Sequence, residues 1–427
     1  MEKTSQYLSP ETLCIHGGYE PKNGEPRVLP IAQSTTYKYD EADEVGKLFD
    51  LEAEGHMYSR ISNPTVDAFE KKIAALEGGA AALATSSGQA ANMLAVLTIC
   101  NSGEHFISLS NLYGGTHTLF TSTLKKFGVS VSFVSPNAKE EEIAAAIRPQ
   151  TKLIFGESIG NPGLDVMDIE YVSSVAHKYG LPLIIDNTFP TPYLCRPIDF
   201  GADIVTHSTT KYLDGHAVAV GGIIVDSGKF DWNSGRFPHL TEKDPSYHGL
   251  SYTEKFGNLA YITKARVAFL RDMGTTMSPM SAFLTNLGTE TLALRMDRHS
   301  SNALRLAQFL EKHEKVTWVN YPLLPGNPNY EKAKKYLPKG ASGVVSFGVK
   351  GGAQAGKKFI DSVRLASLVV HLGDLRTHVL HPASMTHRQL NDEQQVAAGV
   401  RPDGIRLSVG IESVEDLIAD LDQALRA

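Results

Sequence analysis

The chain has 427 residues, of which 42% are hydrophobic and 21% are charged, and its formal net charge is −6. A chain of this length exceeds one compact core, so we expect two or three domains in an ordinary globular protein. The net negative charge argues against a nucleic-acid partner, and no run of about eighteen apolar residues predicts a membrane span.

The N-terminal segment and the cysteines both indicate an intracellular protein. Residues 1–10 are polar and lack the basic and apolar segments of a signal peptide. Cys14, Cys100 and Cys195 are far apart and form no CxxC pair, so neither a disulfide framework nor a zinc knuckle is predicted. We therefore expect three separate thiols in a reducing cytoplasm.

Residues 1–63 form a predicted N-terminal arm, rich in turn-forming residues and without a clear period. At its end, Asn63 is placed to cap a helix that begins at Pro64, and Gly78 is placed to end that helix. Because the arm has little periodicity of its own, we expect it to contribute to a neighbouring subunit.

Residues 64–263 alternate short apolar runs with amphipathic helical patterns. The predicted strands cover residues 106–109, 129–134, 152–155, 181–186 and 203–205. This alternation is typical of an α/β domain with a mostly parallel central sheet covered by helices. Ligands bind such sheets at the carboxyl ends of the strands, so polar residues just after a strand are site candidates.

Residues 264–427 form a predicted smaller C-terminal α+β domain. Long helical patterns dominate, including residues 289–313, and a strand candidate covers residues 343–349. A final helix is expected from Ser413, with its apolar side chains on one face.

The pattern around Lys211 is the strongest chemical signal in the chain. A predicted strand ends there, and Ser208, Thr209 and Thr210 lead directly to the lysine. An imine-forming lysine must be held out of bulk water, and the adjacent hydroxyls suit a phosphate because they donate without adding charge. Taken alone, however, the pattern fits a solvated lysine beside a Ser/Thr turn better.

Asp186 closes a fully apolar predicted strand. A carboxylate in that place is costly to bury unless it is paired with a cation. A protonated pyridine nitrogen is such a cation, and keeping it protonated makes the ring an electron sink. A cap on the following helix is an equally good interpretation of Asp186 taken by itself.

Two further segments fit the same kind of ligand. Gly88 and Gln89 lie in a small-residue turn before a helical pattern, where free backbone N–H groups bind phosphate. Tyr113 lies on a glycine-hinged loop and offers a ring that could stack on a planar cofactor or simply pack. The histidines at 371, 378, 381 and 387 match no standard ligand spacing, so no metal site is expected.

Together these segments resemble the Cys/Met-metabolism family of pyridoxal-phosphate enzymes, from Tyr58 to about residue 410. The resemblance implies the PLP-dependent transferase fold of type I, similar to aspartate aminotransferase, with pyridoxal 5'-phosphate as cofactor. It implies that Lys211 carries the cofactor as a Schiff base and is catalytic. It assigns the cofactor's other contacts to Asp186 at the pyridine nitrogen, Tyr113 on the ring, Asn161 near the hydroxyl, and Gly88, Gln89, Ser208 and Thr210 at the phosphate.

The resemblance also implies contacts between subunits and with the substrate. Tyr58 and Arg60 would reach the phosphate of a neighbouring subunit, so that dimers with shared active sites build a homotetramer. Arg406 would bind the substrate carboxylate, which a guanidinium fork matches bidentately. Arg376 is the alternative anchor for the substrate carboxylate. Most members of the family have no Arg at this position, and they have Ser or Asn in place of His371.

Within the family, the chain most resembles the O-acetylhomoserine sulfhydrylases, through residues 13–19, 24–31, 49–58 and 244–250. This implies a transferase of methionine biosynthesis that replaces the acetate of O-acetyl-L-homoserine with sulfide or a thiol, giving L-homocysteine or methionine. Tyr113 would act beside Cγ as acid or base. The alternatives are a methionine γ-lyase and a cystathionine γ-synthase; γ-lyases often carry Cys where this chain has Gly115.

Overall fold

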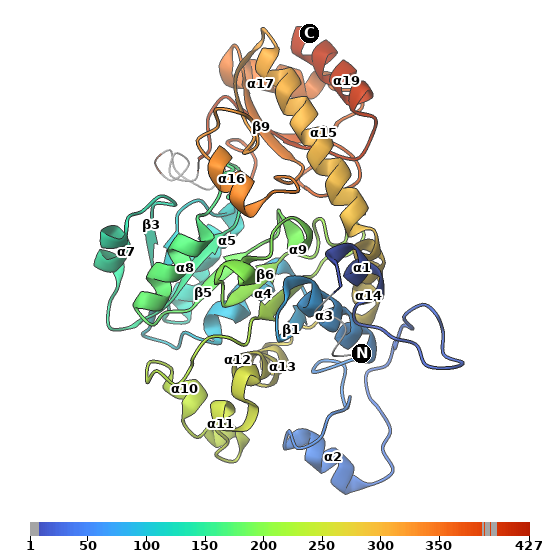
Figure 1. Cartoon of the computed structure of the whole chain (residues 1–427), viewed down its shortest axis with the longest axis vertical. Helices are drawn as coiled ribbons and strands as arrows, with labels where there is room; N and C mark the ends of the chain where they lie inside the picture. The colour runs from blue at the N-terminus through green and yellow to red at the C-terminus, as the bar shows by residue number, and fades with distance from the viewer. Residues whose placement is uncertain (1–7, 387, 389–392, 394–398) are drawn as a thin grey trace.

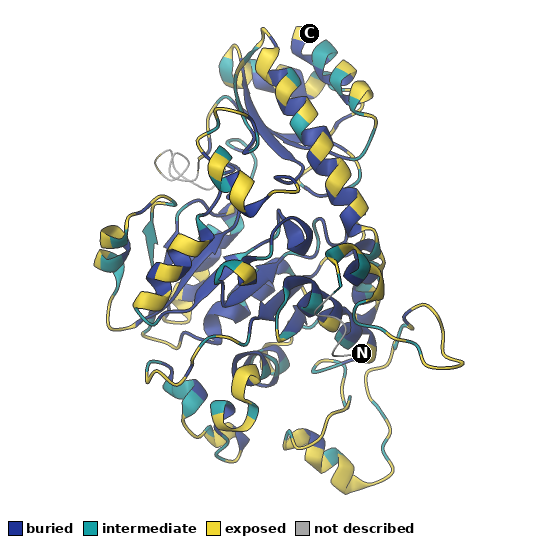
Figure 2. Ribbon diagram, in the orientation of Figure 1, coloured by how far each residue is buried: buried dark blue, intermediate teal, exposed yellow. Residues whose placement is uncertain are grey.

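The computed structural model describes residues 8–386, 388, 393 and 399–427. Figure 1 shows three parts: a central sheet with helices packed on it, a smaller sheet near the C-terminus, and an extended N-terminal segment that carries helix α2 away from the body. The central sheet is buried and the extended segment is largely exposed (Figure 2).

The central sheet has the strand order β1-β7-β6-β5-β4-β2-β3 within the described residues. Strand β7 runs antiparallel to β1 and β6, and the other neighbouring pairs are parallel. The bounds are β1 (Ala81–Thr85), β2 (His105–Leu109), β3 (Ser130–Val134), β4 (Thr151–Glu157), β5 (Leu183–Asp186), β6 (Ile204–His207) and β7 (Gly222–Asp226). The mostly parallel sheet predicted from the sequence is therefore confirmed.

Two hydrophobic cores cover the two faces of this sheet. In β5, Leu183 and Ile185 pack into one core and Ile184 packs into the other, as the alternation of side chains along a strand requires. Helices α3 and α8 contribute to the first core, and α4 and α12 to the second. A strand buried on both faces has apolar side chains at consecutive positions, and this continuous run allows β5 to be predicted from the sequence.

The smaller sheet has the order β10-β11-β12-β9-β8 in the part of the chain that the structure describes. Only the β10–β11 pair is parallel. The bounds are β8 (Val316–Asn320), β9 (Val344–Val349), β10 (Ser367–Leu368), β11 (His378–Leu380) and β12 (Gly404–Ser408). Helices α15 and α17 pack against it, α19 packs on these two helices, and the side chains of all three continue the first core of the central sheet.

The helices fill the connections between the strands. The α-helices are α1 (Pro10–His16), α2 (Ala42–Phe49), α3 (Pro64–Glu77), α4 (Gly88–Leu97), α5 (Gly114–Thr118), α6 (Leu124–Lys126), α7 (Glu140–Ala146), α8 (Ile169–Lys178), α9 (Thr191–Leu194), α10 (Pro238–Thr241), α11 (Tyr252–Phe256), α12 (Ala260–Lys264), α13 (Arg271–Met273), α14 (Pro279–Glu290), α15 (Leu292–Lys312), α16 (Tyr330–Tyr336), α17 (Gly352–Ser362) and α19 (Val414–Arg426). Short π- or 3₁₀-helical turns are η2 (Leu119–Thr123), η3 (Pro197–Phe200), η4 (Pro245–Tyr247), η5 (Gly257–Leu259) and η6 (Ala265–Leu270). None of the helices in the described ranges has the length and apolar character needed to cross a membrane.

Helix α3 begins and ends where the sequence indicates. The Asn63 side chain accepts a hydrogen bond from the backbone N–H of Thr65 at 3.0 Å, and Pro64 is the first helical residue. Gly78 ends the helix with a φ of 72°, a left-handed conformation that favours glycine. The same asparagine donates to the Ala32 carbonyl at 2.8 Å, so the cap also ties the arm to the body.

The structure differs from the sequence-based predictions in two strands of the central sheet and in one helix. Strands β1 and β7 were not predicted; β1 has the sequence AALAT, with no β-branched residue before Thr85. The helical pattern over residues 289–313 is not one helix, because α14 ends at Glu290 and α15 begins at Leu292. Just before that break, Gly288 lies so close to Asp214 that a Cβ would stand 2.1 Å from the Asp214 carbonyl oxygen.

Candidate active site

A cavity of about 210 Å³ lies at the carboxyl ends of β4, β5 and β6. In the sheet register Glu157 pairs with Asp186, and Asp186 pairs with Thr206, so the ends of the three strands are aligned. Residues 370–372 and Arg406, on β12, close the cavity from the smaller sheet. Nine of the residues predicted for the site line it: Gly88, Gln89, Tyr113, Asn161, Asp186, Ser208, Thr210, Lys211 and Arg406.

Lys211 lies in the turn that follows β6, with its backbone N–H bonded to the Ser208 carbonyl at 3.2 Å. Burial, together with the charge of Arg406, lowers the pKa of the Lys211 amine to about 8. Its Nζ is 3.3 Å from Nδ1 of His371. A buried amine with a lowered pKa has the state that an imine-forming or proton-accepting lysine requires.

The Asp186 carboxylate is held by donors on both oxygens. Oδ1 accepts hydrogen bonds from the backbone N–H and the hydroxyl of Thr188. Oδ2 accepts from Nδ2 of Asn92 at 3.1 Å, and the Asn92 Oδ1 accepts in turn from the Thr206 hydroxyl at 2.6 Å. The bonds to Thr188 form a local turn; α9 begins only at Thr191, so Asp186 does not cap it. Asp186 therefore faces the cavity in a fixed orientation.

The start of helix α4 supplies a backbone cradle. Ser87 caps the helix by accepting from the Ala90 N–H at 3.1 Å, and the first two helical residues are Gly88 and Gln89. A Cβ at Gly88 would stand 2.6 Å from Cβ of Ser208, so only glycine permits this approach. N–H groups at the first positions of a helix have no intrahelical acceptor, and they attract anions.

The two hydroxyl-bearing residues on the other side of this cradle are also held in place. The Ser208 N–H donates to the Thr188 hydroxyl at 2.9 Å. The Thr210 hydroxyl exchanges hydrogen bonds of 3.1 Å with the backbone of Gly221, just before β7. The strand ends thus fix both residues opposite the start of α4.

Tyr113 stands at the start of α5 with part of its ring exposed. Its backbone N–H donates to Oε1 of Glu157 at 2.7 Å. Glu157 is buried at the end of β4, and burial together with the Asp186 charge raises the pKa of its carboxyl well above the usual range. The loop that carries Tyr113 is therefore tied to the same edge of the sheet as Asp186.

Arg406 is buried, with its guanidinium at the inner wall of the cavity. Nη1 donates to Oδ1 of Asn161 at 3.2 Å and Nη2 to the His371 carbonyl at 3.0 Å, while Nε has no partner among the described residues. Burial lowers the pKa of Arg406 to about 10, which leaves it charged at neutral pH. A buried guanidinium with an unused donor is suited to a carboxylate.

Three predicted site residues lie outside this cavity. Arg60 donates to the Arg271 carbonyl and packs 5.2 Å from the centre of the Tyr58 ring, at the base of the N-terminal arm. Arg376 pairs with Asp374 at 3.5 Å, and 67% of its side chain is exposed. Their assigned roles stay predictions.

Sequence reasoning missed Asn92, Glu157 and Thr188 as cavity residues, and it left the role of His371 open. Glu157 follows an apolar run as Asp186 does, so the same rule on strand ends would have found it. Asn92 is one helical turn after Gly88 and shares its face of α4. Thr188 follows Asp186 by two positions, the spacing of a turn in which an Asp side chain accepts from the backbone N–H two residues on, so a local signal for it was present.

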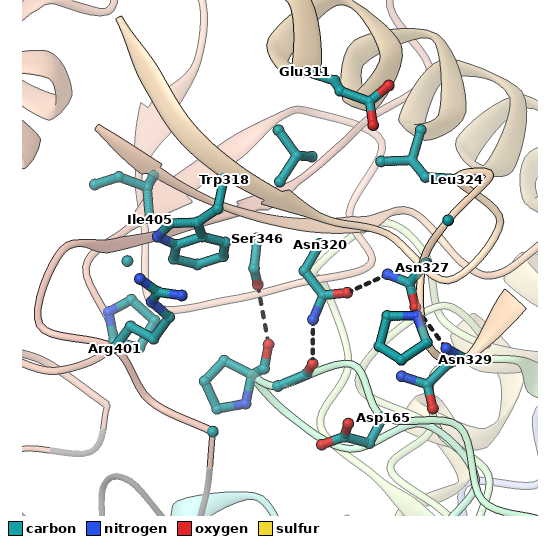
Figure 3. Close-up of a pocket in the computed structure, with 18 of the residues that line it drawn as sticks. Asp165, Glu311, Trp318, Asn320, Leu324, Asn327, Asn329, Ser346, Arg401 and Ile405 are labelled. Carbon is teal, nitrogen blue, oxygen red and sulfur yellow. Dashed lines mark hydrogen bonds between the residues drawn. The ribbon is translucent and has the colours of Figure 1, made fainter. Parts of the chain in front are cut away.

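A second cavity of about 570 Å³ is lined by Pro162, Gly163, Gly404 and Ile405, which neighbour Asn161 and Arg406 of the first cavity in the sequence (Figure 3). Its polar side chains are occupied with one another: Asn320 donates to the Gly163 carbonyl at 2.5 Å and Asn327 to Asn320 at 2.7 Å. The Arg401 guanidinium lies 4.4 Å from the centre of the Trp318 ring. Within the described residues no lining side chain has a buried polar atom without a partner, so this cavity offers less chemistry than the one around Lys211.

Known proteins resemble this chain over its whole length. The model of the Cys/Met metabolism PLP-dependent enzyme family matches residues 11–426. An O-acetyl-L-homoserine sulfhydrylase of Leptospira meyeri is 48% identical over 100% of this chain and 98% of its own, and a homocysteine synthase of Schizosaccharomyces pombe is 50% identical over 97% of each. The crystal structure of a putative O-acetylhomoserine (thiol)-lyase of Campylobacter jejuni, which contains a pyridoxyl-lysine monophosphate, superposes with a TM-score of 0.95 at 37% identity, covering 98% of this chain and 100% of that one.

Proposed function

This chain belongs to the Cys/Met-metabolism family of PLP-dependent enzymes, and on that premise we propose that it is an O-acetylhomoserine sulfhydrylase. The proposed reaction is O-acetyl-L-homoserine plus hydrosulfide giving L-homocysteine plus acetate, with a thiol such as methanethiol giving methionine. The names of the relatives at 48–50% identity favour this reaction over those of a methionine γ-lyase or a cystathionine γ-synthase.

The residues of the cavity fit pyridoxal 5'-phosphate. Gly88 lets the start of α4 pack directly against Ser208. The free N–H groups of the helix and the Ser208 side chain therefore line the same part of the cavity, which suits a phosphate. Asp186 is held by Asn92 and Thr188 at the other end, where a protonated ring nitrogen would lie. Lys211, with its lowered pKa, would hold the cofactor's aldehyde. This convergence on one cavity is the observation that carries the proposal.

When bound, pyridoxal phosphate supplies an electron sink that stabilises negative charge on the substrate's α-carbon. Asp186 would keep the proton on the ring nitrogen and so preserve that sink. Arg406 would bind the substrate carboxylate through its unused donors. A free Lys211 amine would remove the proton from Cα of the substrate.

The later steps need a second proton transfer near Cβ and Cγ. Lys211 is the candidate base for the proton on Cβ, and its loss allows acetate to depart from Cγ. Tyr113, at the cavity mouth, is the candidate acid or base beside Cγ, and Glu157 fixes its backbone. Hydrosulfide then adds at Cγ, and the same groups return the protons to Cβ and Cα.

The proposal extends to assembly and location. Tyr58 and Arg60 lie outside the cavity of their own chain, and in the proposed homotetramer each would complete a neighbour's phosphate site. Asn161 would contact the cofactor's hydroxyl through the same amide that holds Arg406. The three cysteines are free and buried, which supports a reducing cytoplasm.

The deciding experiment incubates the cofactor-loaded protein with O-acetyl-L-homoserine, with and without sulfide, and quantifies homocysteine and 2-oxobutyrate. Homocysteine that forms only with sulfide and exceeds 2-oxobutyrate establishes the sulfhydrylase. If 2-oxobutyrate dominates in both reactions, the protein is an eliminating lyase and the proposal is wrong. The Lys211→Ala variant should give neither product.

A further inference from the structure

His371 contacts both the lysine and the arginine of the cavity. Its Nδ1 is 3.3 Å from the Lys211 Nζ, and its backbone carbonyl accepts from the Arg406 Nη2 at 3.0 Å. The residue lies in the segment between β10 and β11, and its side chain lines the cavity. One residue of the smaller sheet therefore touches the two groups to which the proposed reaction assigns the base and the carboxylate anchor.

The surroundings of His371 keep its imidazole neutral. Burial and the positive charge of Lys211 lower the pKa of His371 to about 4. His378, whose ring centre is 5.9 Å away, and Arg406 act in the same direction, and only Asp374 opposes them. Asp374 is itself bonded to His378 at 3.3 Å. A neutral imidazole facing an amine through Nδ1 serves as a hydrogen-bond acceptor for it.

We propose that His371 is a positioning residue that accepts a hydrogen bond from the Lys211 nitrogen, aims that nitrogen at the substrate's α-proton, and holds Arg406 through its carbonyl. The inference rests on the proposed function, in which Lys211 is the base. The Ser or Asn that the family has at this position carries a hydrogen-bond donor as well as an acceptor. A neutral imidazole that accepts through Nδ1 has no donor on that atom. The lone pair of the freed lysine amine is therefore left pointing away from residue 371, toward the cavity.

The test compares holoenzymes with His, Asn and Leu at position 371. The first readout needs no turnover: it is the pH midpoint at which the visible absorbance of the resting, cofactor-loaded protein changes. His371→Leu removes the acceptor but keeps water out, so the protonated nitrogen loses a partner and the midpoint should fall by about one pH unit. His371→Asn keeps an acceptor oxygen and should stay near the wild-type midpoint.

The second readout separates kcat from KM for O-acetyl-L-homoserine. His371→Leu should lower kcat by roughly 10- to 100-fold, as expected for a reacting group that is displaced by about 1 Å, and should change KM little because the backbone carbonyl remains. His105→Asn is the matched control: it alters a buried histidine on β2 that bonds to Thr151 and Ser132 and does not line the cavity, and it should move neither the midpoint nor kcat.

An unchanged midpoint and kcat in His371→Leu would overturn the inference. If the Leu variant does not load the cofactor, His371→Met offers a more adaptable apolar side chain for the same two readouts. A protein that makes no homocysteine but still shows the midpoint shift would disprove the proposed function and leave the contact between His371 and Lys211 standing.

Discussion

The ring of Tyr113 lies over Gly115, so closely that a Cβ at position 115 would stand 2.6 Å from the Tyr113 Cε1 and 3.2 Å from Cδ1. Gly115 is inside helix α5 with no unusual φ, so the tight contact here comes from the Tyr113 ring and not from the backbone conformation. The presence or absence of a side chain at 115 thus decides where the Tyr113 ring rests.

Gly115→Cys should move the Tyr113 ring away from its place at the cavity mouth. We expect homocysteine formation to fall by about tenfold or more, since a displaced acid–base group is less effective, and the 2-oxobutyrate share to rise. Product ratios with and without sulfide measure both effects. Gly46→Ala is the control, because Gly46 is also helical and a Cβ there meets no atom within 4 Å of the same chain. An unchanged product ratio would show that Gly115 does not govern partitioning.

The substrate anchor is the second prediction, because Arg406 and Arg376 differ sharply in burial. Arg406→Lys should raise KM for O-acetyl-L-homoserine by about 100-fold, since lysine cannot reproduce the fork that bonds Asn161, His371 and a carboxylate. Arg376→Lys should change KM by less than about threefold, because an exposed ion pair contributes little. Steady-state kinetics on the two variants decides between them; a large effect at Arg376 would reverse the assignment.

The chain of contacts behind Asp186 gives a third prediction. Asp186→Asn should lower kcat by about 100-fold or more, because an amide cannot pair with a protonated ring nitrogen. Asn92→Ala removes only one donor to Oδ2 and should cost about tenfold, near the effect of one hydrogen bond to a charged group. In the double variant the losses should not add, because Asn92 acts through Asp186. Additive losses would mean that Asn92 has a separate role.

The lowered pKa of Lys211 predicts how the stability of the cofactor-free protein depends on pH. Its pKa is lowered to about 8 in the folded protein and has its ordinary value of 10.5 when unfolded. Between these values the unfolded chain binds more protons, so the free energy of unfolding rises with pH across this interval. Below it, the charged buried amine costs up to about 3 kcal/mol. Cofactor-free Lys211→Met protein should therefore exceed the wild type in stability at neutral pH and match it above the unfolded pKa.

Urea unfolding of the cofactor-free proteins, at neutral pH and at a pH above the unfolded pKa, measures this difference in stability between Lys211→Met and the wild type. Lys357→Met is the control, because Lys357 is exposed on helix α17 and should show no pH-dependent gain. If Lys211→Met is no more stable than the wild type at neutral pH, the amine is not desolvated in the folded chain.

The sequence predicted those parts of the fold that are written locally. The cap at Asn63, the apolar run of β5 and the turn at Lys211 all depend on residues within a few positions of one another. The Asp186 environment could not be predicted, because Asn92 and Thr206 reach it from a helix and a strand that only the folded sheet brings together. The same holds for His371, which lies 160 positions from Lys211 in the sequence.

Sharing of sites between subunits is the last prediction, and the exposure of the arm motivates it. Tyr58 is 42% exposed and lies outside the cavity formed by its own chain, although the family resemblance assigns it and Arg60 to the phosphate. If each subunit completes its neighbour's site, Lys211→Ala and Arg60→Ala damage opposite halves of one site. A mixed dimer then contains one doubly damaged site and one intact site.

Mixing the two inactive variants should therefore restore activity. With random pairing, half of the dimers are mixed and each has one intact site of two, so roughly a quarter of the wild-type activity should return. Refolding the variants together, with each refolded alone as the control, measures this recovery. If both residues served the same chain's site, every site in the mixture would carry one defect and no activity would return, which would place Arg60 within its own subunit's site.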